Sequence, residues 1–200
     1  MKWKLHSSDY DAVTSGVPQG SALGPQLFYM YIAPLAGLIK SFGVRYHQFV
    51  NDGQLFVAIS NDNRDIQLAT LEQCLLKVHE WLLHNGLFHD PDKSCAVQFV
   101  TGRWRGSEVD VTSISVSGVS IEPAASVKSL GITLDNRLSL DQHVTDVCKA
   151  CYYHIRTLCH LRDSLPDDVA KIVVVSIITS RLDYCNSLFF GMSAKNFSKL

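Results

Sequence analysis

The stretch YHQFVNDGQLFVAI, residues 46–59, decides the fold that we expect around it. Two short apolar runs, Val44–Val50 and Leu55–Ser60, are separated by the tetrapeptide Asn-Asp-Gly-Gln at residues 51–54. Turn-forming residues between two apolar runs of strand length predict a β-hairpin with a polar tip. Asp52 is the one carboxylate at that tip. The hairpin either presents it to a divalent metal ion or contains it because Asn-Asp-Gly suits the backbone of a turn.

A glycine-rich turn precedes the hairpin. This turn, SGVPQGSALGP at residues 15–25, follows a short strand expected over Asp11–Thr14. It leads into an apolar helix that we expect from Pro25 to about Ile39. Because that helix is apolar on nearly every side, it is expected to be buried. The turn either lets a ligand approach the backbone closely, since glycine has no side chain, or is purely structural.

The rest of the chain mixes helices and strands before ending in helices. Leucines at helical spacing predict an amphipathic helix from Arg64 to about His84, ended by Asn85-Gly86. Further on we expect a strand over Cys95–Val100, a hairpin around Gly118, a strand through Leu130–Leu134, a helix capped by Ser139 with Gln142, and a helix over Val169–Ile178. This order predicts an α+β fold with a helical appendix, divided between residues 123 and 138.

The composition excludes some classes of protein. With 46% hydrophobic and 18% charged residues, the 200-residue chain has the composition of a folded domain. Its net charge of -1 gives no overall basic field. Residues 12–39 carry no charge, but repeated glycines and prolines there argue against a membrane span. The start shows no secretory signal, so we expect an intracellular protein with reduced cysteines.

Cysteine and histidine spacing raises a zinc interpretation near residue 150. Cys148 and Cys151 lie on the apolar stripe of a predicted helix, whereas a zinc knuckle places a turn between its ligands. We therefore expect core cysteines and no structural zinc. The same helix carries a run of basic and aromatic side chains, Lys149, Tyr152, Tyr153, His154 and Arg156. Such a run suits base stacking and phosphate contact, or it is a solvated helix face.

Taken together, these segments resemble the reverse transcriptases of non-LTR (LINE-type) retrotransposons, in particular the jockey-like branch. The resemblance is carried by SGVPQGSALGPQLF and YHQFVNDGQLFVAI, and continues through VHEWLLHNGLFHDPDKS, VKSLGITLDNRLSLDQHV, CKACYYHIRTLCHLRDSL and SRLDYCNSLFFGMS. It covers the chain from about Asp11 to Ser193. It implies a partial polymerase palm, an antiparallel sheet with packed helices, over residues 1–125. A primer-grip strand and a helical thumb would follow over residues 126–200.

The resemblance also implies roles for single residues. The pocket in which template and incoming nucleotide pair would be lined by Gly16, Gln19 and Gly20. Residues 49–52 match a Tyr-Ala-Asp-Asp box whose aspartates hold the catalytic metal ions. Here the box reads Phe-Val-Asn-Asp, so Asn51 replaces one aspartate and Asp52 matches the other.

Two further positions gain a role from the same resemblance. Lys93 matches a lysine that is a candidate proton donor to the pyrophosphate leaving group. Its plain alternative is an exposed lysine beside two aspartates. Leu130 and Gly131 fall in the primer grip, and their plain alternative is an ordinary buried strand.

One metal ligand of the family has no match in this sequence. The family takes another aspartate from a strand upstream of the glycine-rich turn, and neither Asp9 nor Asp11 stands in a context that resembles it. The Mg²⁺ site would therefore rest on Asp52, with an RNA template and a DNA primer as partners. We expect a fragment of an RNA-directed DNA polymerase that is catalytically defective by itself. The alternative is a non-catalytic nucleic-acid-binding or interaction module derived from such an element.

Overall fold

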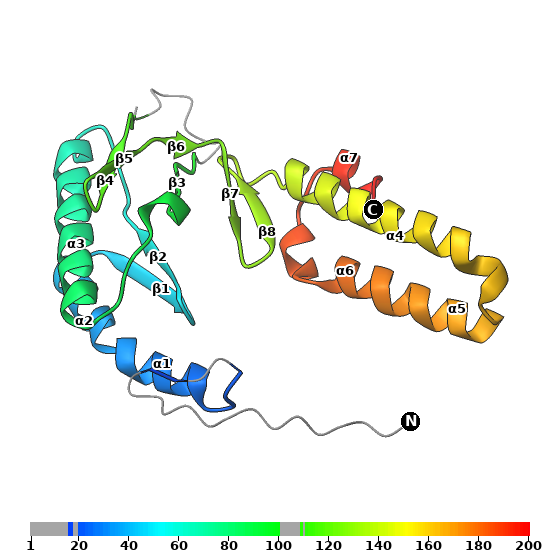
Figure 1. The fold of residues 1–200 in the computed structure, drawn as a ribbon. Helices are drawn as coiled ribbons and strands as arrows, with labels where there is room; N and C mark the ends of the chain where they lie inside the picture. Colours follow the sequence, from blue (N-terminus) through cyan, green and yellow to red (C-terminus); the bar gives the residue numbers. More distant parts are fainter. Residues whose placement is uncertain (1–15, 18–19, 101–108, 110) are drawn as a thin grey trace, which may run out of the picture. The chain divides into compact units, whose positions relative to one another are not determined.

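The computed structural model of the chain describes residues 16–17, 20–100, 109 and 111–200. The chain divides into two compact units, residues 1–89 and 90–200, and each mixes helices with short strands (Figure 1). This confirms the mixed helix-and-strand class. The expected boundary between a palm at residues 1–125 and a primer grip and thumb at residues 126–200 concerns function, so it stays a prediction. The strand expected over residues 11–14 lies outside the described residues.

The first unit consists of two short helices, a hairpin and one long helix. In chain order these are α1 Gly24–Ile32, α2 Pro34–Ser41, β1 Arg45–Phe49, β2 Asp52–Phe56 and α3 Arg64–His84. The helix α2 packs against both α3 and β1. Ile39 and Cys74 are fully buried at this junction, so it forms the core of the unit. The predicted amphipathic helix is confirmed as α3; it ends at His84, with Asn85 as its C-cap before Gly86, which has a φ of +66°.

The apolar helix expected from Pro25 to Ile39 is wrong in two respects. It is divided at Ala33, because Pro34 has no backbone N–H to donate to the preceding turn. It is also not buried throughout, since Tyr29 is 57% and Met30 is 71% exposed. Apolar composition alone did not reveal that no described segment of this unit covers those side chains. Within the described part of the chain, no helix has the length and apolarity needed to cross a bilayer.

The strands of the second unit pair only two by two. They are β3 Ala96–Val97, β4 Ile114–Val116, β5 Val119–Ile121, β6 Pro123–Ala124, β7 Ser126–Ser129 and β8 Ile132–Asp135. The pairs β4–β5 and β7–β8 are antiparallel, whereas β3 and β6 form a parallel pair of two residues each. The hairpin around Gly118 is confirmed. The strand expected over Cys95–Val100 is only two residues long. Among the described residues the strands form four separate two-stranded sheets instead of the one antiparallel sheet that was expected.

Helices complete the second unit. They are η1 Pro91–Lys93, α4 Asp141–Leu161, η2 Arg162–Ser164, α5 Asp167–Val174, η3 Val175–Thr179, α6 Ser180–Asp183, η4 Asn186–Phe189 and α7 Ala194–Phe197. The run α5–η3–α6 returns along α4 as an antiparallel neighbour (Figure 1). Its middle segment, η3, is a π-helical turn that continues α5. The helix predicted over residues 169–178 therefore spans parts of both α5 and η3.

The start of α4 is capped differently from the expected capping box. The carboxylate of Asp135 accepts hydrogen bonds from the backbone N–H groups of Arg137, Ser139 and Leu140 at 3.1, 3.0 and 2.8 Å. It also accepts one from the Ser139 hydroxyl at 3.1 Å. Gln142 does not reach back to the cap, because its side-chain amide donates to Asp146. Partial burial opposes ionisation of Asp135, but these hydrogen bonds outweigh it and lower the pKa of its carboxyl.

His143 in the first turn of α4 gives the second unit a predicted acid sensitivity. Burial lowers the pKa of this imidazole below its usual 6.5, against the opposing effect of Asp146. Its Nδ1 accepts the backbone N–H of Thr133 at 3.4 Å, and its ring stacks on Phe189. The unfolded chain therefore binds a proton before the folded one does, so stability is complete above pH of about 6.5 and falls as the pH drops below it.

We expect His143→Asn to remove this pH dependence, because an amide oxygen can replace the Nδ1 acceptor and does not titrate. The measurement is hydrogen exchange of the amides in residues 132–158, corrected for the intrinsic pH dependence of exchange. Free energies of exchange should fall below pH of about 6.5 in the original chain and stay level in the variant. Equal slopes in the two proteins would show that His143 is not responsible.

Candidate functional site

The hairpin β1–β2 positions the predicted metal-binding residues. Its strands are antiparallel, with Phe49 opposite Asp52, so the turn consists of Val50 and Asn51 alone. The hairpin is therefore confirmed, but the tip expected over residues 51–54 is wrong. Pairing continues through Gly53 and Gln54, because a two-residue turn leaves those positions opposite Gln48 and His47 in register.

The turn itself is strained. Val50 has a φ of +54°, a left-handed conformation that β-branched residues rarely adopt. The side-chain amide of Gln48 donates to the carbonyl oxygen of Val50 at 2.9 Å and so supports the turn. As a result Asn51 sits at the tip, and Asp52 begins β2 directly beside Phe49. Strain of this kind often occurs at functional sites.

The two faces of the hairpin differ. Alternation along the strands places Asp52 on the same face as Phe49 and His47, and all three are exposed. The opposite face carries Tyr46, whose ring lies so close to Gly53 that an added Cβ there would stand 3.4 Å from it. Burial, with a smaller contribution from Tyr29, raises the pKa of Tyr46. Asp52 therefore lies on the open face of a hairpin whose other face is half-buried.

The glycine-rich turn has two described glycines among the predicted site residues. Gly16 and Gly20 have φ values of +77° and +86°, which explains why glycine suits both positions. A Cβ added to either would meet nothing within 4 Å among the atoms described. The backbone there is open to solvent. Gln19, the third residue expected in this pocket, lies outside the described residues.

Lys93 belongs to the second unit. It ends the short helix η1, and its side chain is 84% exposed. Its Nζ lies 3.3 Å from a carboxylate oxygen of Asp90, which is the ordinary surface arrangement that the sequence allowed. Its proton-donor role stays a prediction.

Leu130 and Gly131 form the turn of the hairpin β7–β8 instead of part of a strand. Both have positive φ values, +48° and +83°, and the strands pair up to Ser129 and Ile132. The expected strand through Leu130 is therefore wrong at its start. Tyr184 contacts this turn: its hydroxyl donates to the carbonyl oxygen of Leu130 at 2.6 Å, and its ring packs against Gly131. Sequence reasoning missed Tyr184, because the contact joins residues 54 positions apart.

The donor set at the hairpin does not fit the two Mg²⁺ ions of a polymerase. Asp52 supplies one carboxylate, and Asn51 supplies a neutral amide oxygen. Across the described ranges, no group of three or more His, Cys, Asp or Glu side chains is arranged to hold a metal ion. Mg²⁺ prefers carboxylate oxygens, and a pair of ions brings four positive charges to the site.

The two cysteines that raised a zinc interpretation both lie on α4. Cys151 is buried, and the Cys148 thiol donates to the carbonyl oxygen of Lys199.

Comparison with known proteins identifies the family. The family described as "Reverse transcriptase (RNA-dependent DNA polymerase)" matches residues 3–134. The chain is 26% identical over 154 residues to the RNA-directed DNA polymerase from mobile element jockey of Drosophila melanogaster, an alignment covering 72% of this chain and 16% of that protein. The protein of the same name from Drosophila funebris is 25% identical over 146 residues, covering 68% and 14%.

The chain therefore belongs to the reverse transcriptase family. Within that family it is similar to the jockey-type polymerases of non-LTR retrotransposons, which confirms the resemblance carried by its motifs. It spans only 16% and 14% of the length of those two relatives. No solved structure matches the chain.

Proposed function

We propose that this chain is the palm and thumb portion of an RNA-directed DNA polymerase and that it engages an RNA template paired with a DNA primer. The observation that carries the proposal is the hairpin β1–β2, which sets Asn51 at a tight tip and Asp52 on an open face in a member of the reverse transcriptase family. Residues 1–125 form the palm portion. Residues 126–200 form the primer grip and the thumb.

In this proposal the glycine-rich turn and the hairpin β7–β8 contact nucleic acid. Gly16 and Gly20 leave room for a base pair against the backbone, and Gln19 can hydrogen-bond to it. Leu130 and Gly131 support the primer end from the turn that Tyr184 holds. Lys93 would protonate the leaving pyrophosphate.

We further propose that this chain is catalytically defective by itself. Of the three carboxylates that the family uses, only Asp52 has a match in the sequence. One negative charge opposes the four positive charges of two Mg²⁺ ions, so the nucleotide itself would have to hold the metal. Metal ligands act as a unit, and removal of members of such a unit lowers rates by several powers of ten.

The second candidate is a module that binds nucleic acid without catalysing its synthesis, and the shortage of carboxylates at the hairpin favours it. Both candidates predict binding of a primer-template duplex. A merely inert remnant does not. Binding therefore tests the proposal independently of polymerase activity.

The experiment is a fluorescence-anisotropy titration of a labelled RNA–DNA duplex over a range of salt concentrations. We expect measurable binding at low salt, with affinity that falls by roughly 0.7 to 0.9 logarithmic units per tenfold rise in salt for each phosphate neutralised. The matched control is an uncharged dextran of similar mass carrying the same label, which should not bind. Absence of duplex binding at low salt would reject both the polymerase portion and the binding module.

A further inference from the structure

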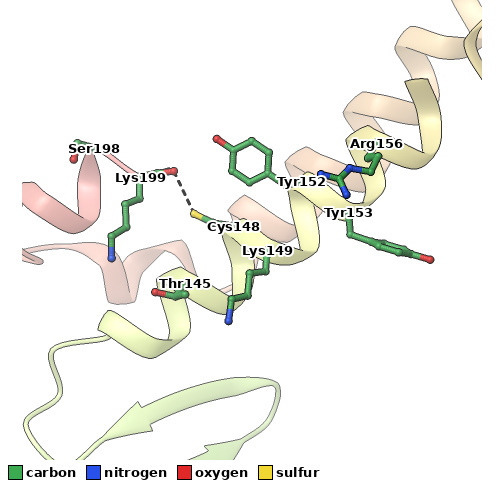
Figure 2. Close-up of a pocket in the computed structure, with 8 residues that line it drawn as sticks. All are labelled: Thr145, Cys148, Lys149, Tyr152, Tyr153, Arg156, Ser198 and Lys199. Carbon is green, nitrogen blue, oxygen red and sulfur yellow. Dashed lines mark hydrogen bonds between the residues drawn. The ribbon is translucent and has the colours of Figure 1, made fainter. Parts of the chain in front are cut away.

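A shallow groove in the second unit lies along α4 and is bordered on one side by the C-terminal segment. It has a volume of about 640 Å³ and is lined by Thr145, Cys148, Lys149, Tyr152, Tyr153, Arg156, Ser198 and Lys199. Figure 2 shows six of these side chains along α4, with Tyr152 and Tyr153 pointing to opposite sides of the helix and with Ser198 and Lys199 of the C-terminal segment facing Cys148. The Cys148 thiol fixes the opposite wall by donating to the carbonyl oxygen of Lys199 at 3.2 Å.

The side chains on α4 form two neighbouring rows. Residues four apart lie above one another on a helix, so residues 145, 149 and 153 form one row and residues 148, 152 and 156 form the other. Each row contains one tyrosine and one cation, a single turn apart. Lys149 precedes its tyrosine, and Arg156 follows its own. Seven residues separate the two cations, which is about 10 Å along the helix axis.

The charge of the groove is positive. Its lining includes three cations and no acidic residue. In the described part of the chain, neither Lys149 nor Arg156 forms an ion pair. The nearest acidic side chain on the helix, Asp146, accepts hydrogen bonds from Gln142 and Thr133 instead. An anion entering the groove would therefore find Lys149 and Arg156 without an ionic partner, whereas the Lys199 ammonium already donates to the side-chain oxygen of Asn196 at 3.4 Å.

The two tyrosines present flat apolar surface to solvent. Tyr152 and Tyr153 are each 68% exposed, although an aromatic ring gains free energy from burial. Their rings therefore offer stacking surface to a planar ligand. An acidic peptide would use the cations and leave these rings without a matching group. A nucleic-acid strand with unpaired bases uses both, through its phosphates and its bases.

We propose that this groove binds an unpaired nucleic-acid strand, with Lys149, Arg156 and Lys199 on its phosphates and with Tyr152 and Tyr153 stacked on its bases. The inference rests on the proposed function, which supplies nucleic acid as the ligand, and adds a site for single strands made of residues that belong to neither the hairpin β1–β2 nor the primer grip. A duplex cannot use the tyrosines in this way, because its bases are already stacked on one another.

The test compares a short fluorescein-labelled oligo(dT) with a labelled RNA–DNA duplex on the full chain and on matched variants. Replacing both tyrosines, in Y152A/Y153A, is expected to weaken oligo(dT) binding by about tenfold or more. Y152F/Y153F should retain the affinity, because phenylalanine also stacks. Alanine favours helices, so circular dichroism should show α4 intact in both variants. Duplex affinity should change little.

Charge is tested separately. K149A/R156A should reduce the dependence of log affinity on log salt for oligo(dT) by about 1.4, two contacts at roughly 0.7 each. Lys171→Ala removes an exposed cation on α5 that lies outside the groove, and it should leave oligo(dT) binding unchanged. Poly-glutamate competing as well as unlabelled oligo(dT) would overturn the proposal in favour of a general anion surface.

The outcomes separate this inference from the proposed function. Suppose that the original chain binds the duplex but either does not bind oligo(dT) or binds it equally well after Y152A/Y153A. The groove proposal then fails and the proposed function stands. If the chain binds oligo(dT) through the tyrosines but does not bind the duplex, the groove proposal stands and the proposed function fails.

Discussion

Primer extension by this chain on poly(rA) and oligo(dT) with Mg²⁺ is expected to remain at background, on the order of 10⁴-fold or more below a family member with all three metal-binding carboxylates. Asp52 alone cannot neutralise two divalent ions, and Asn51 contributes an oxygen without a charge. The measurement is incorporation of labelled dTTP over time, with Mg²⁺ replaced by EDTA as the metal-free reference.

The variant Asn51→Asp sharpens this test. It restores the second carboxylate of the hairpin, yet incorporation should stay at background, because the upstream aspartate of the family still has no counterpart. Asp52→Asn should also change nothing, since we expect no incorporation by the original chain. Robust incorporation that requires Mg²⁺ and disappears in Asp52→Asn would contradict the proposed defect and would show that the hairpin holds a working metal site.

The sequence predicted the pairing of β1 with β2 and of β4 with β5, but not the pairs β3–β6 and β7–β8, and it was a poor guide to where turns lie. In the hairpin β1–β2 the polar residues Asp52 and Gly53 looked like the tip, but the structure turns at Val50 and Asn51. In β7–β8 a leucine occupies the turn with a φ of +48°. In both cases strand pairing favours a register that puts a large apolar residue into a left-handed conformation. Local turn preferences do not contain that information.

Burial was harder to predict than helix formation. The spacing of the leucines predicted the limits of α3 correctly, because the apolar residues on one face of a helix recur at the helical period. The apolar segment before the first hairpin is helical as well, divided into α1 and α2, but Tyr29 and Met30 remain exposed. A side chain's own hydrophobicity does not say whether another segment covers it.

The residues of the candidate sites also differ in whether the sequence alone could predict them. Asn51 and Asp52 were found from a motif, and the hairpin that holds them follows from local sequence. Tyr184 and the groove along α4 depend on contacts between distant segments, which a single sequence does not reveal. The exposed Lys149, Tyr152, Tyr153 and Arg156 were visible as a pattern. Only their arrangement in two rows opposite Lys199 favours a ligand over a solvated helix face.

Asp135→Ala is expected to lower the free energy of unfolding of the second unit by about 3 kcal/mol, the largest effect on stability that we predict. The carboxylate accepts four hydrogen bonds, three of them from backbone N–H groups in the connection to α4. That connection contains Leu138 and Leu140 with φ values of +54° and +61°. Left-handed leucines are unfavourable by about 1 to 2 kcal/mol each, so the connection needs these hydrogen bonds to keep its shape.

The measurement is hydrogen exchange of the amides in α4 and β8, with Asp163→Ala as the matched control. Asp163 lies on the exposed short helix η2, and its removal should change the free energy of unfolding by less than about 0.5 kcal/mol. The pKa of Asp135 is lowered in the folded chain, so its contribution is complete above the usual value of 3.8 and is lost as the pH falls through the folded value. The original chain and Asp135→Ala should therefore differ most near neutral pH and converge in strong acid. A difference that persists unchanged into strong acid would mean that packing of the side chain, and not its charge, stabilises the start of α4.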